Sequence, residues 1–172
     1  MAEQNKQPLI DLVSAKGIAE MDAWLAKYPK KGKRSAVMGG LMMAQLENNN
    51  HLTPELMDAV ADYIGIPHMA AYEVATFYSM YNLEPVGKYV INVCTNISCS
   101  LRGSDEVLAH LKDRLGIEPG ETTDDKQFTV RTVECLGACA GAPMFEVDRV
   151  YHENLDKEKI NSIIDRLASP AN

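Results

Sequence analysis

All four cysteines of this 172-residue chain lie between positions 94 and 139, where they form two closely spaced pairs. The first pair has the spacing Cys94-x4-Cys99, the second has Cys135-x3-Cys139, and 35 residues separate the pairs. The first residues of the chain contain no apolar segment typical of a secretory signal, so we expect a reducing compartment. Clustered cysteines in such a compartment favour metal binding or redox chemistry over a structural disulfide framework.

The segments around the two pairs predict an α/β fold. In chain order we expect a strand at 88–93, a helix at 104–115, a strand at 128–133, a hairpin with strands at 144–147 and 150–151, and a helix at 156–168. Ser104 is expected to cap the first of these helices, and the hairpin is expected to turn at Asp148 and Arg149. In this β-α-β-β-β-α order, the first two strands can pair in parallel through a right-handed crossover.

The first 85 residues predict a small bundle of helices. The expected helices cover about residues 9–28, 35–47, 54–64 and 68–80, with short loops between them. Thr53 and Pro54 have the residue types of an N-cap and a first helical turn. The pattern changes at residues 85–87, so we expect a helical domain at 1–85 and an α/β domain at 86–172.

Each cysteine pair follows the carboxyl end of an expected strand, and open α/β sheets tend to bind ligands at that edge. The residues beside the cysteines are small, which allows backbone N–H groups to approach a negatively charged centre. The spacing favours an iron–sulfur cluster bound by four thiolates. Spacing alone leaves open a structural zinc site, a redox-active dithiol and inert buried thiols. None of the four histidines lies near a cysteine in sequence, which argues against a Rieske centre.

Composition excludes several other classes of protein. The net charge of -7 argues against a protein whose affinity for nucleic acid depends on neutralising phosphates. The longest apolar run, at residues 37–44, is far shorter than the roughly 20 residues of a membrane span. A Gly-x-Gly-x-x-Gly fingerprint and a phosphate-binding loop are also absent from the sequence. The sequence therefore does not predict a dinucleotide or phosphate site on this chain.

In combination, several motifs resemble one family. They are Cys94-Thr95-Asn96-x-x-Cys99, Gly120-Glu121-Thr122-Thr123-Asp124, Glu134-Cys135-Leu136-Gly137-Ala138-Cys139 and Ala142-Pro143, together with Ile64-Gly65-Ile66-Pro67 and Val74-Ala75-Thr76-Phe77-Tyr78 in the helical half. This set resembles the thioredoxin-like [2Fe–2S] ferredoxin subunit of respiratory complex I, which is the E subunit of the bacterial NADH–quinone oxidoreductase. The stretch 48–51 departs from the family, in which a glycine followed by an aromatic residue is common.

The resemblance implies a fold, a cofactor and a partner. The α/β half would have the thioredoxin-like fold, and Cys94, Cys99, Cys135 and Cys139 would bind one [2Fe–2S] cluster. The subunit would dock on the flavin-bearing, NADH-oxidising subunit, which would bind FMN and NADH, and the cluster would exchange single electrons with that flavin. The chain would thus be a subunit of an enzyme, NADH–quinone oxidoreductase, with no complete active site on this chain alone. The helical half at 1–85 has no cluster of ligand-type residues and has the charges of a surface bundle, so we expect it to be the docking region.

The resemblance also implies a place in the cell and leaves alternatives. The chain would be peripheral on the cytoplasmic side of the inner membrane as part of the complex, without membrane insertion. A similar subunit occurs in the diaphorase module of NAD-dependent hydrogenases and formate dehydrogenases. An alternative of a different class is a zinc-stabilised scaffold protein.

Four further features of the sequence lead to expectations that the structure can test. Tyr72, Phe77, Tyr78 and Tyr81 form either an interface or part of the core. Met38 and Met42 are expected to fill the core between two helices. At Gly137, a side chain is expected to clash or to displace an N–H donor from sulfur. Arg102 is expected to help compensate the cluster charge, because residues 135–141 contain no Lys or Arg.

Overall fold

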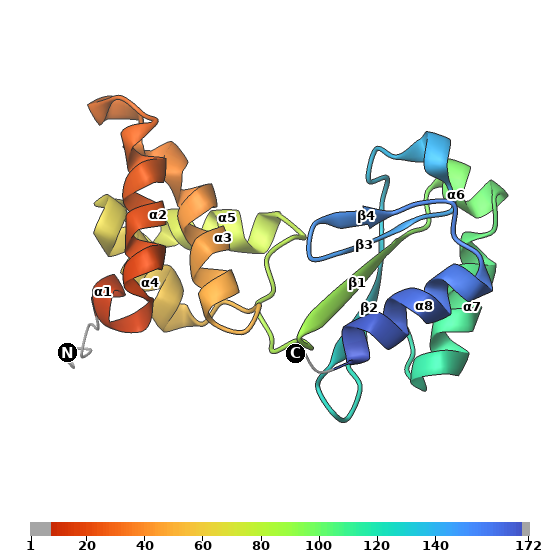
Figure 1. Ribbon diagram of the computed structural model, residues 1–172. Coiled ribbons are helices and arrows are strands. Elements are labelled where there is room, and N and C mark those ends of the chain that lie inside the picture. Colours follow the sequence, from red (N-terminus) through yellow and green to blue (C-terminus); the bar gives the residue numbers. More distant parts are fainter. Residues whose placement is uncertain (1–7, 170–172) are drawn as a thin grey trace. The chain divides into compact units, whose positions relative to one another are not determined.

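The computed structural model describes residues 8–169 (Figure 1). The chain divides into two compact units, the first ending at Pro85 and the second beginning at Val86. Each unit has a hydrophobic core of its own. Within the described residues, no helix is both long and apolar enough to cross a membrane.

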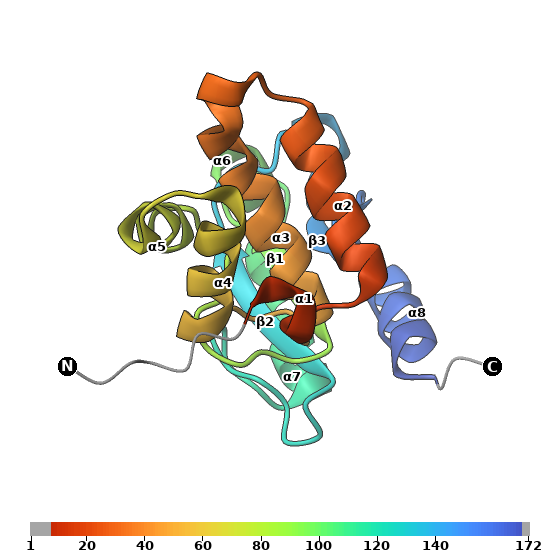
Figure 2. The same ribbon diagram turned by 90° about the vertical axis from the view of Figure 1, so that its left-hand side faces the viewer.

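The first unit is a bundle of helices. Its elements are α1 (Leu9–Leu12), α2 (Ala15–Ala26), the 3-10 helix η1 (Lys30–Ala36), α3 (Val37–Glu47), α4 (Pro54–Ile64) and α5 (His68–Phe77). Helix α3 lies between α2 and α4 (Figure 2), and α5 packs against both α3 and α4. Close approach of α2 and α3 requires Gly39, because a Cβ atom there would lie 2.3 Å from the Trp24 ring. The predicted helical bundle is confirmed.

Two helix boundaries in this unit differ from the prediction. The helix expected over 9–28 is interrupted, because the Ser14 hydroxyl accepts a hydrogen bond from the Gly17 N–H and starts α2 as its N-cap. The Ser14 hydroxyl also donates to the Glu47 carboxylate on α3, at 2.9 Å. Helix α5 ends at Phe77 instead of Met80, because the buried Gln45 side chain binds the backbone of the following segment. The first difference follows from a local cap, which the contact with Glu47 supports, and the second follows from a tertiary contact.

The starts and ends of α4 follow the sequence signals. Thr53 accepts a hydrogen bond from the Leu56 N–H at 3.3 Å, and Pro54 is the first helical residue. Gly65 ends the helix in the left-handed conformation.

The prediction that Met38 and Met42 both fill the core of this unit is half wrong. Met38 is exposed, while Met42 is partly buried against the core.

The second unit contains a four-stranded sheet in the order β2-β1-β3-β4. The strands are β1 (Tyr89–Cys94), β2 (Phe128–Val133), β3 (Phe145–Val147) and β4 (Val150–His152). Strands β1 and β2 are parallel, whereas the pairs β1–β3 and β3–β4 are antiparallel. The hairpin turns at Asp148 and Arg149, both with positive φ, which is the geometry of a type I′ turn. The predicted α/β class, the order of these strands along the chain and the parallel pairing of the first two strands are confirmed.

Two of the four helical segments described in this unit pack on one face of the sheet. The unit has α6 (Ile97–Leu101), α7 (Ser104–Leu115), the 3-10 helix η2 (Cys139–Gly141) and α8 (Lys157–Ala168). Ile91 and Val93 of β1 pack in one core with Leu111 of α7 and Ile160 of α8. Alternation along the strand therefore turns Cys94 toward the opposite face, at the carboxyl end of β1.

The structure adds one helix to the expected elements of this unit and corrects one cap. Helix α6 is the addition, because five residues are too few to show a helical period. Ser104 does not cap α7: Gly103 occupies the N-cap with φ +101°, and Ser104 is the first helical residue. The Ser104 hydroxyl is fully buried without a hydrogen-bond partner in the described structure.

Candidate metal centre

The first cysteine pair is buried at the carboxyl end of β1. Cys94 is the last residue of the strand and is 3% exposed, and Cys99 on α6 is 2% exposed. Asn96 starts α6, with its side-chain oxygen accepting a hydrogen bond from the Ile97 N–H at 2.9 Å. This cap turns the chain sharply after the strand, so that Cys99 folds back against Cys94 in one apolar cluster.

The second pair lies on the loop that follows β2, and both thiols are exposed. The sulfur atoms of Cys135 and Cys139 are 3.5 Å apart. Between them, the Gly137 N–H donates to the Cys135 sulfur at 3.4 Å, with the glycine at φ +84°. A Cβ at Gly137 would have no atom within 4 Å, so the predicted clash is wrong and the φ angle is the constraint.

Hydrogen bonds connect the two cysteine loops. The Thr95 N–H donates to the Val133 carbonyl at 3.1 Å, directly beside both strand ends. The Asn96 amide donates to the Glu134 carboxylate at 2.6 Å. Leu136 of the second loop packs against the buried first pair. The structure therefore brings the segments of all four predicted site residues to one end of the sheet.

One thiol of the buried pair has a strongly shifted pKa. Burial raises the pKa of the Cys99 thiol to about 11, and its interaction with Cys94 adds to the shift. Cys99 is therefore a neutral thiol at physiological pH, and a metal must displace its proton on binding.

The arrangement of the thiols fits a centre with two metal ions better than a centre with one. The thiols lie as two pairs on adjoining loops: the sulfur atoms of Cys135 and Cys139 are 3.5 Å apart, and Cys99 interacts with both Cys94 and Cys139. A [2Fe–2S] cluster takes two thiolates at each iron, whereas a structural zinc ion takes four ligands at one point. The donor set therefore fits a [2Fe–2S] cluster.

A sheet with helices on one face and two cysteine pairs at one end defines a thiol-liganded metal or redox protein. The family model of thioredoxin-like [2Fe–2S] ferredoxins matches residues 21–168. The chain belongs to this family.

Named relatives agree with this family. The E subunit of the NADH-quinone oxidoreductase of Rickettsia bellii (strain RML369-C) is 47% identical over 143 residues, which cover 83% of this chain and 86% of that protein. An E subunit of the NADH-quinone oxidoreductase of Rhizobium meliloti (strain 1021) is 44% identical over 146 residues, which cover 85% of each chain.

A solved structure of an NAD+-reducing [NiFe]-hydrogenase in the air-oxidised state shares the fold. The TM-score is 0.64 at 22% identity, and the match covers 74% of this chain. The chain spans only 22% of the length of that hydrogenase chain.

The predicted family and its [2Fe–2S] cofactor are confirmed, while the four ligands and the domain boundaries stay predictions. Sequence reasoning missed the roles of Asn96, Glu134, Ala142 and Met144, which hold the cysteine loops together. Their adjacency to the cysteines, and the capping residue type of Asn96, were the signals available. Arg102 was singled out for its charge, and its hydrogen bond to the second loop is visible only in three dimensions.

Proposed function

We propose that this chain is the electron-transfer subunit of an NADH–quinone oxidoreductase, and that Cys94, Cys99, Cys135 and Cys139 bind its one [2Fe–2S] cluster. The observation that carries the proposal is the placement of two cysteine pairs on adjoining loops at one end of the sheet. The E-subunit relatives, at 44–47% identity over most of the chain, support the assignment to this complex.

Within the site, the two pairs have different roles in this proposal. The bound cluster would supply a carrier for one electron at a time. The buried Cys94 and Cys99 exclude water from one side, and the exposed Cys135 and Cys139 leave the other side open to a redox partner. The N–H of Gly137 donates to the Cys135 sulfur, which stabilises negative charge there.

The proposed redox partner is the NADH-oxidising subunit, which would bind FMN and NADH. Next to the cysteines, Ile97 and Leu101 of α6 are 73% and 83% exposed. Four residues apart on one helix, they share a face, and Cys99 lies between them in sequence. Exposed apolar side chains beside a redox site are typical of a protein interface. We therefore place the flavin-bearing partner against α6.

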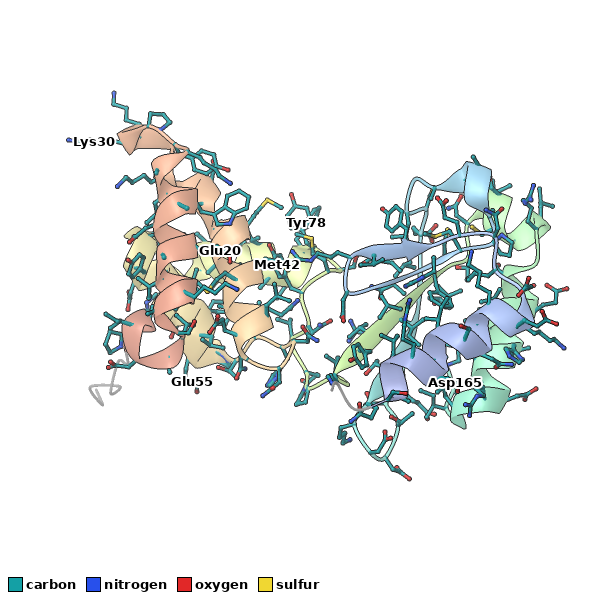
Figure 3. The ribbon with its side chains drawn as sticks, in the orientation of Figure 1. Glu20, Lys30, Met42, Glu55, Tyr78 and Asp165 are labelled. Atoms are coloured by element: carbon teal, nitrogen blue, oxygen red, sulfur yellow. The ribbon has the colours of Figure 1, made fainter. Side chains whose placement is uncertain are left out.

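The first unit offers a second contact surface, which we name the docking segment, residues 77–83. Phe77 is 79% exposed, and the rings of Phe77 and Tyr78 pack edge to face with centroids 5.0 Å apart. Tyr78 stands out from the end of α5 (Figure 3), and Met80 and Leu83 are exposed as well. Residues 74–83 contain no charged residue, although 24% of the chain is charged.

Buried polar groups hold this segment in place. The Gln45 side chain, 4% exposed, donates to the Met80 carbonyl at 3.1 Å and accepts from the Asn82 N–H at 2.6 Å. The Tyr81 hydroxyl donates to the Met38 carbonyl at 2.9 Å, and burial raises the pKa of Tyr81 to about 12. A rigid, uncharged, apolar surface loses little entropy when a partner binds. We therefore assign the docking segment to contact with another subunit, and Tyr81 to its support.

The location follows from the proposed partner. NADH is a cytoplasmic reductant, so we place the assembled subunit on the cytoplasmic side of the inner membrane. A diaphorase module of an NAD-dependent hydrogenase is a second candidate, favoured by the fold shared with the NAD+-reducing [NiFe]-hydrogenase.

Co-purification with each candidate flavoprotein tests the proposal. We expect the chain to form a stable complex with the flavin subunit of NADH–quinone oxidoreductase and to contain two iron and two sulfide ions. Dithionite reduction should produce the EPR signal of a reduced [2Fe–2S] cluster. A colourless protein that contains zinc, or stable association only with a hydrogenase flavoprotein, would contradict it.

A further inference from the structure

An arginine side chain connects the two cysteine loops at the point where each loop continues past its second cysteine. Arg102 is the C-cap of α6, three residues after Cys99. Its Nε–H donates a hydrogen bond to the Ala142 carbonyl at 2.7 Å. Ala142 lies three residues after Cys139, is fully buried, and packs with Cys94 and Cys99. The hydrogen bond therefore joins the ends of the two segments that carry the cysteines.

The other end of the second loop is held separately. There the Asn96 amide binds the Glu134 carboxylate, and the Thr95 N–H binds the Val133 carbonyl. Cys135 and Cys139 lie between this contact and the one that Arg102 makes. At the Arg102 end, the carbonyls of Gly141, Pro143 and Met144 also accept backbone hydrogen bonds, from the N–H groups of Asn154, Leu155 and Cys94. Loss of the Arg102 contact would therefore loosen the end near Cys139 without freeing it, and would leave the contacts near Cys135 in place.

Arg102 also brings a positive charge to the site. Residues 135–141 contain no Lys or Arg. A guanidinium group stays protonated at all relevant pH values, and a cluster with four thiolates is negatively charged. The side chain therefore combines a donor at a fixed place with a charge that favours a reduced cluster.

We propose that Arg102 is a positioning residue of the cluster site: its Nε–H sets the place of the loop that carries Cys135 and Cys139, and its charge raises the midpoint potential. This inference rests on the proposed function, because it requires a cluster bound by the four cysteines.

Two substitutions separate the donor from the charge. Arg102→Gln puts an amide N–H the same number of bonds from Cα as the arginine Nε, but removes the charge. Arg102→Lys keeps the charge, but puts a methylene group where Nε donates. Arg149→Gln on the exposed hairpin turn is the control, because it makes the same change in net charge within the same unit.

The experiment uses the full chain with its cluster reconstituted. It measures the rate of cluster loss to an iron chelator, the midpoint potential, and amide hydrogen exchange at residues 139–144 of the metal-free chain. We expect Arg102→Lys to lose its cluster about tenfold faster than wild type, with faster exchange and a near-native potential. Arg102→Gln should retain its cluster at close to the wild-type rate, with a lowered potential.

The opposite pattern, with stable Arg102→Lys and labile Arg102→Gln, would overturn the positioning role and leave only a charge effect. Equal behaviour of Arg102→Gln and Arg149→Gln would overturn the local role of the charge. If Arg102→Lys fails to fold, Arg102→Met takes its place as the variant without a donor. Wild-type rates of hydrogen exchange and cluster loss in Arg102→Gln, with faster rates in Arg102→Met, would still support the donor role. Wild-type rates in both variants would overturn it. Failure of the proposed function is distinguishable, because wild type itself would then lack the [2Fe–2S] spectrum.

Discussion

The side-chain amide of Asn96 donates a 2.6 Å hydrogen bond to the carboxylate of Glu134, and so joins the two loops where they leave β1 and β2. The same amide uses its oxygen to cap α6 through the Ile97 N–H. One side chain therefore both shapes the first cysteine loop and fixes the second beside it.

Replacing Asn96 by Asp should weaken this junction. The new carboxylate keeps the capping oxygen, but it faces Glu134 with a like charge in place of a donor. We expect the metal-free chain to lose about 1 kcal/mol of unfolding free energy in urea denaturation, and the cluster to be lost faster. Adding Glu134→Gln should restore both properties, because the Gln amide can donate to the new carboxylate. A double variant no better than Asn96→Asp would contradict this explanation.

Each of the four cysteines should be required for the cluster. We expect Cys→Ala at position 94, 99, 135 or 139 to remove the visible absorption, since one iron then loses one of its two thiolates. Iron content and the absorption spectrum measure the effect. A Cys99→Ala protein with full iron content and a native spectrum would rule out the assignment of four ligands.

Gly137 tests the importance of the backbone donor. Its φ of +84° strains a β-branched residue such as valine by roughly 1–2 kcal/mol, although the space beside it is open. We expect Gly137→Val to lower cluster occupancy or to shift the midpoint potential by tens of millivolts, where ~59 mV is tenfold for one electron. Gly137→Asn is the matched control, because Asn tolerates this conformation and should cause a smaller change. Native iron content and potential in Gly137→Val would show that the glycine only eases the turn.

The docking segment should contribute to assembly without affecting the cluster. We expect Phe77→Ser to weaken binding to the flavin subunit by about 2 kcal/mol or more, as for other buried aromatic anchors of interfaces. Val150→Ser, on an exposed strand of the second unit, is the control for loss of an exposed apolar side chain. Titration calorimetry with the purified partner measures both. Native affinity of Phe77→Ser would exclude the docking segment as an anchor.

Stability of the second unit should decrease in mild acid because of His152. Partial burial lowers the pKa of His152 below 6.5, and the charges of Arg166 and Lys159 lower it further. The unfolded chain thus takes up a proton at a higher pH than the folded chain. The corresponding stability is present above pH 6.5 and is lost as pH falls through the folded-state pKa.

We therefore expect the unfolding free energy of the metal-free chain to fall between about pH 7.5 and pH 5.5. His152→Gln should reduce the slope, because it removes the titrating group. Urea denaturation at several pH values measures this, and equal slopes in both proteins would exclude His152 as the cause.

The sequence by itself determined the class of the fold, the succession of strands along the chain, the family and the cofactor. The β-branched runs, the turn at Asp148 and Arg149, and the cap at Thr53 are local signals, and local steric and hydrogen-bonding preferences suffice to explain them. The two cysteine spacings are local in the same sense. They can be recognised in the sequence because both cysteines of each pair lie in one short loop.

Tertiary structure alone decided what joins those loops and where α5 ends. Arg102 and Ala142 are 40 residues apart, Asn96 and Glu134 are 38 apart, and Gln45 ends α5 through a segment 35 residues away. No periodicity or spacing encodes such pairs, because each depends on the chain having already folded. The burial that separates Cys94 and Cys99 from the exposed Cys135 and Cys139 is likewise a property of packing, since all four are the same residue type.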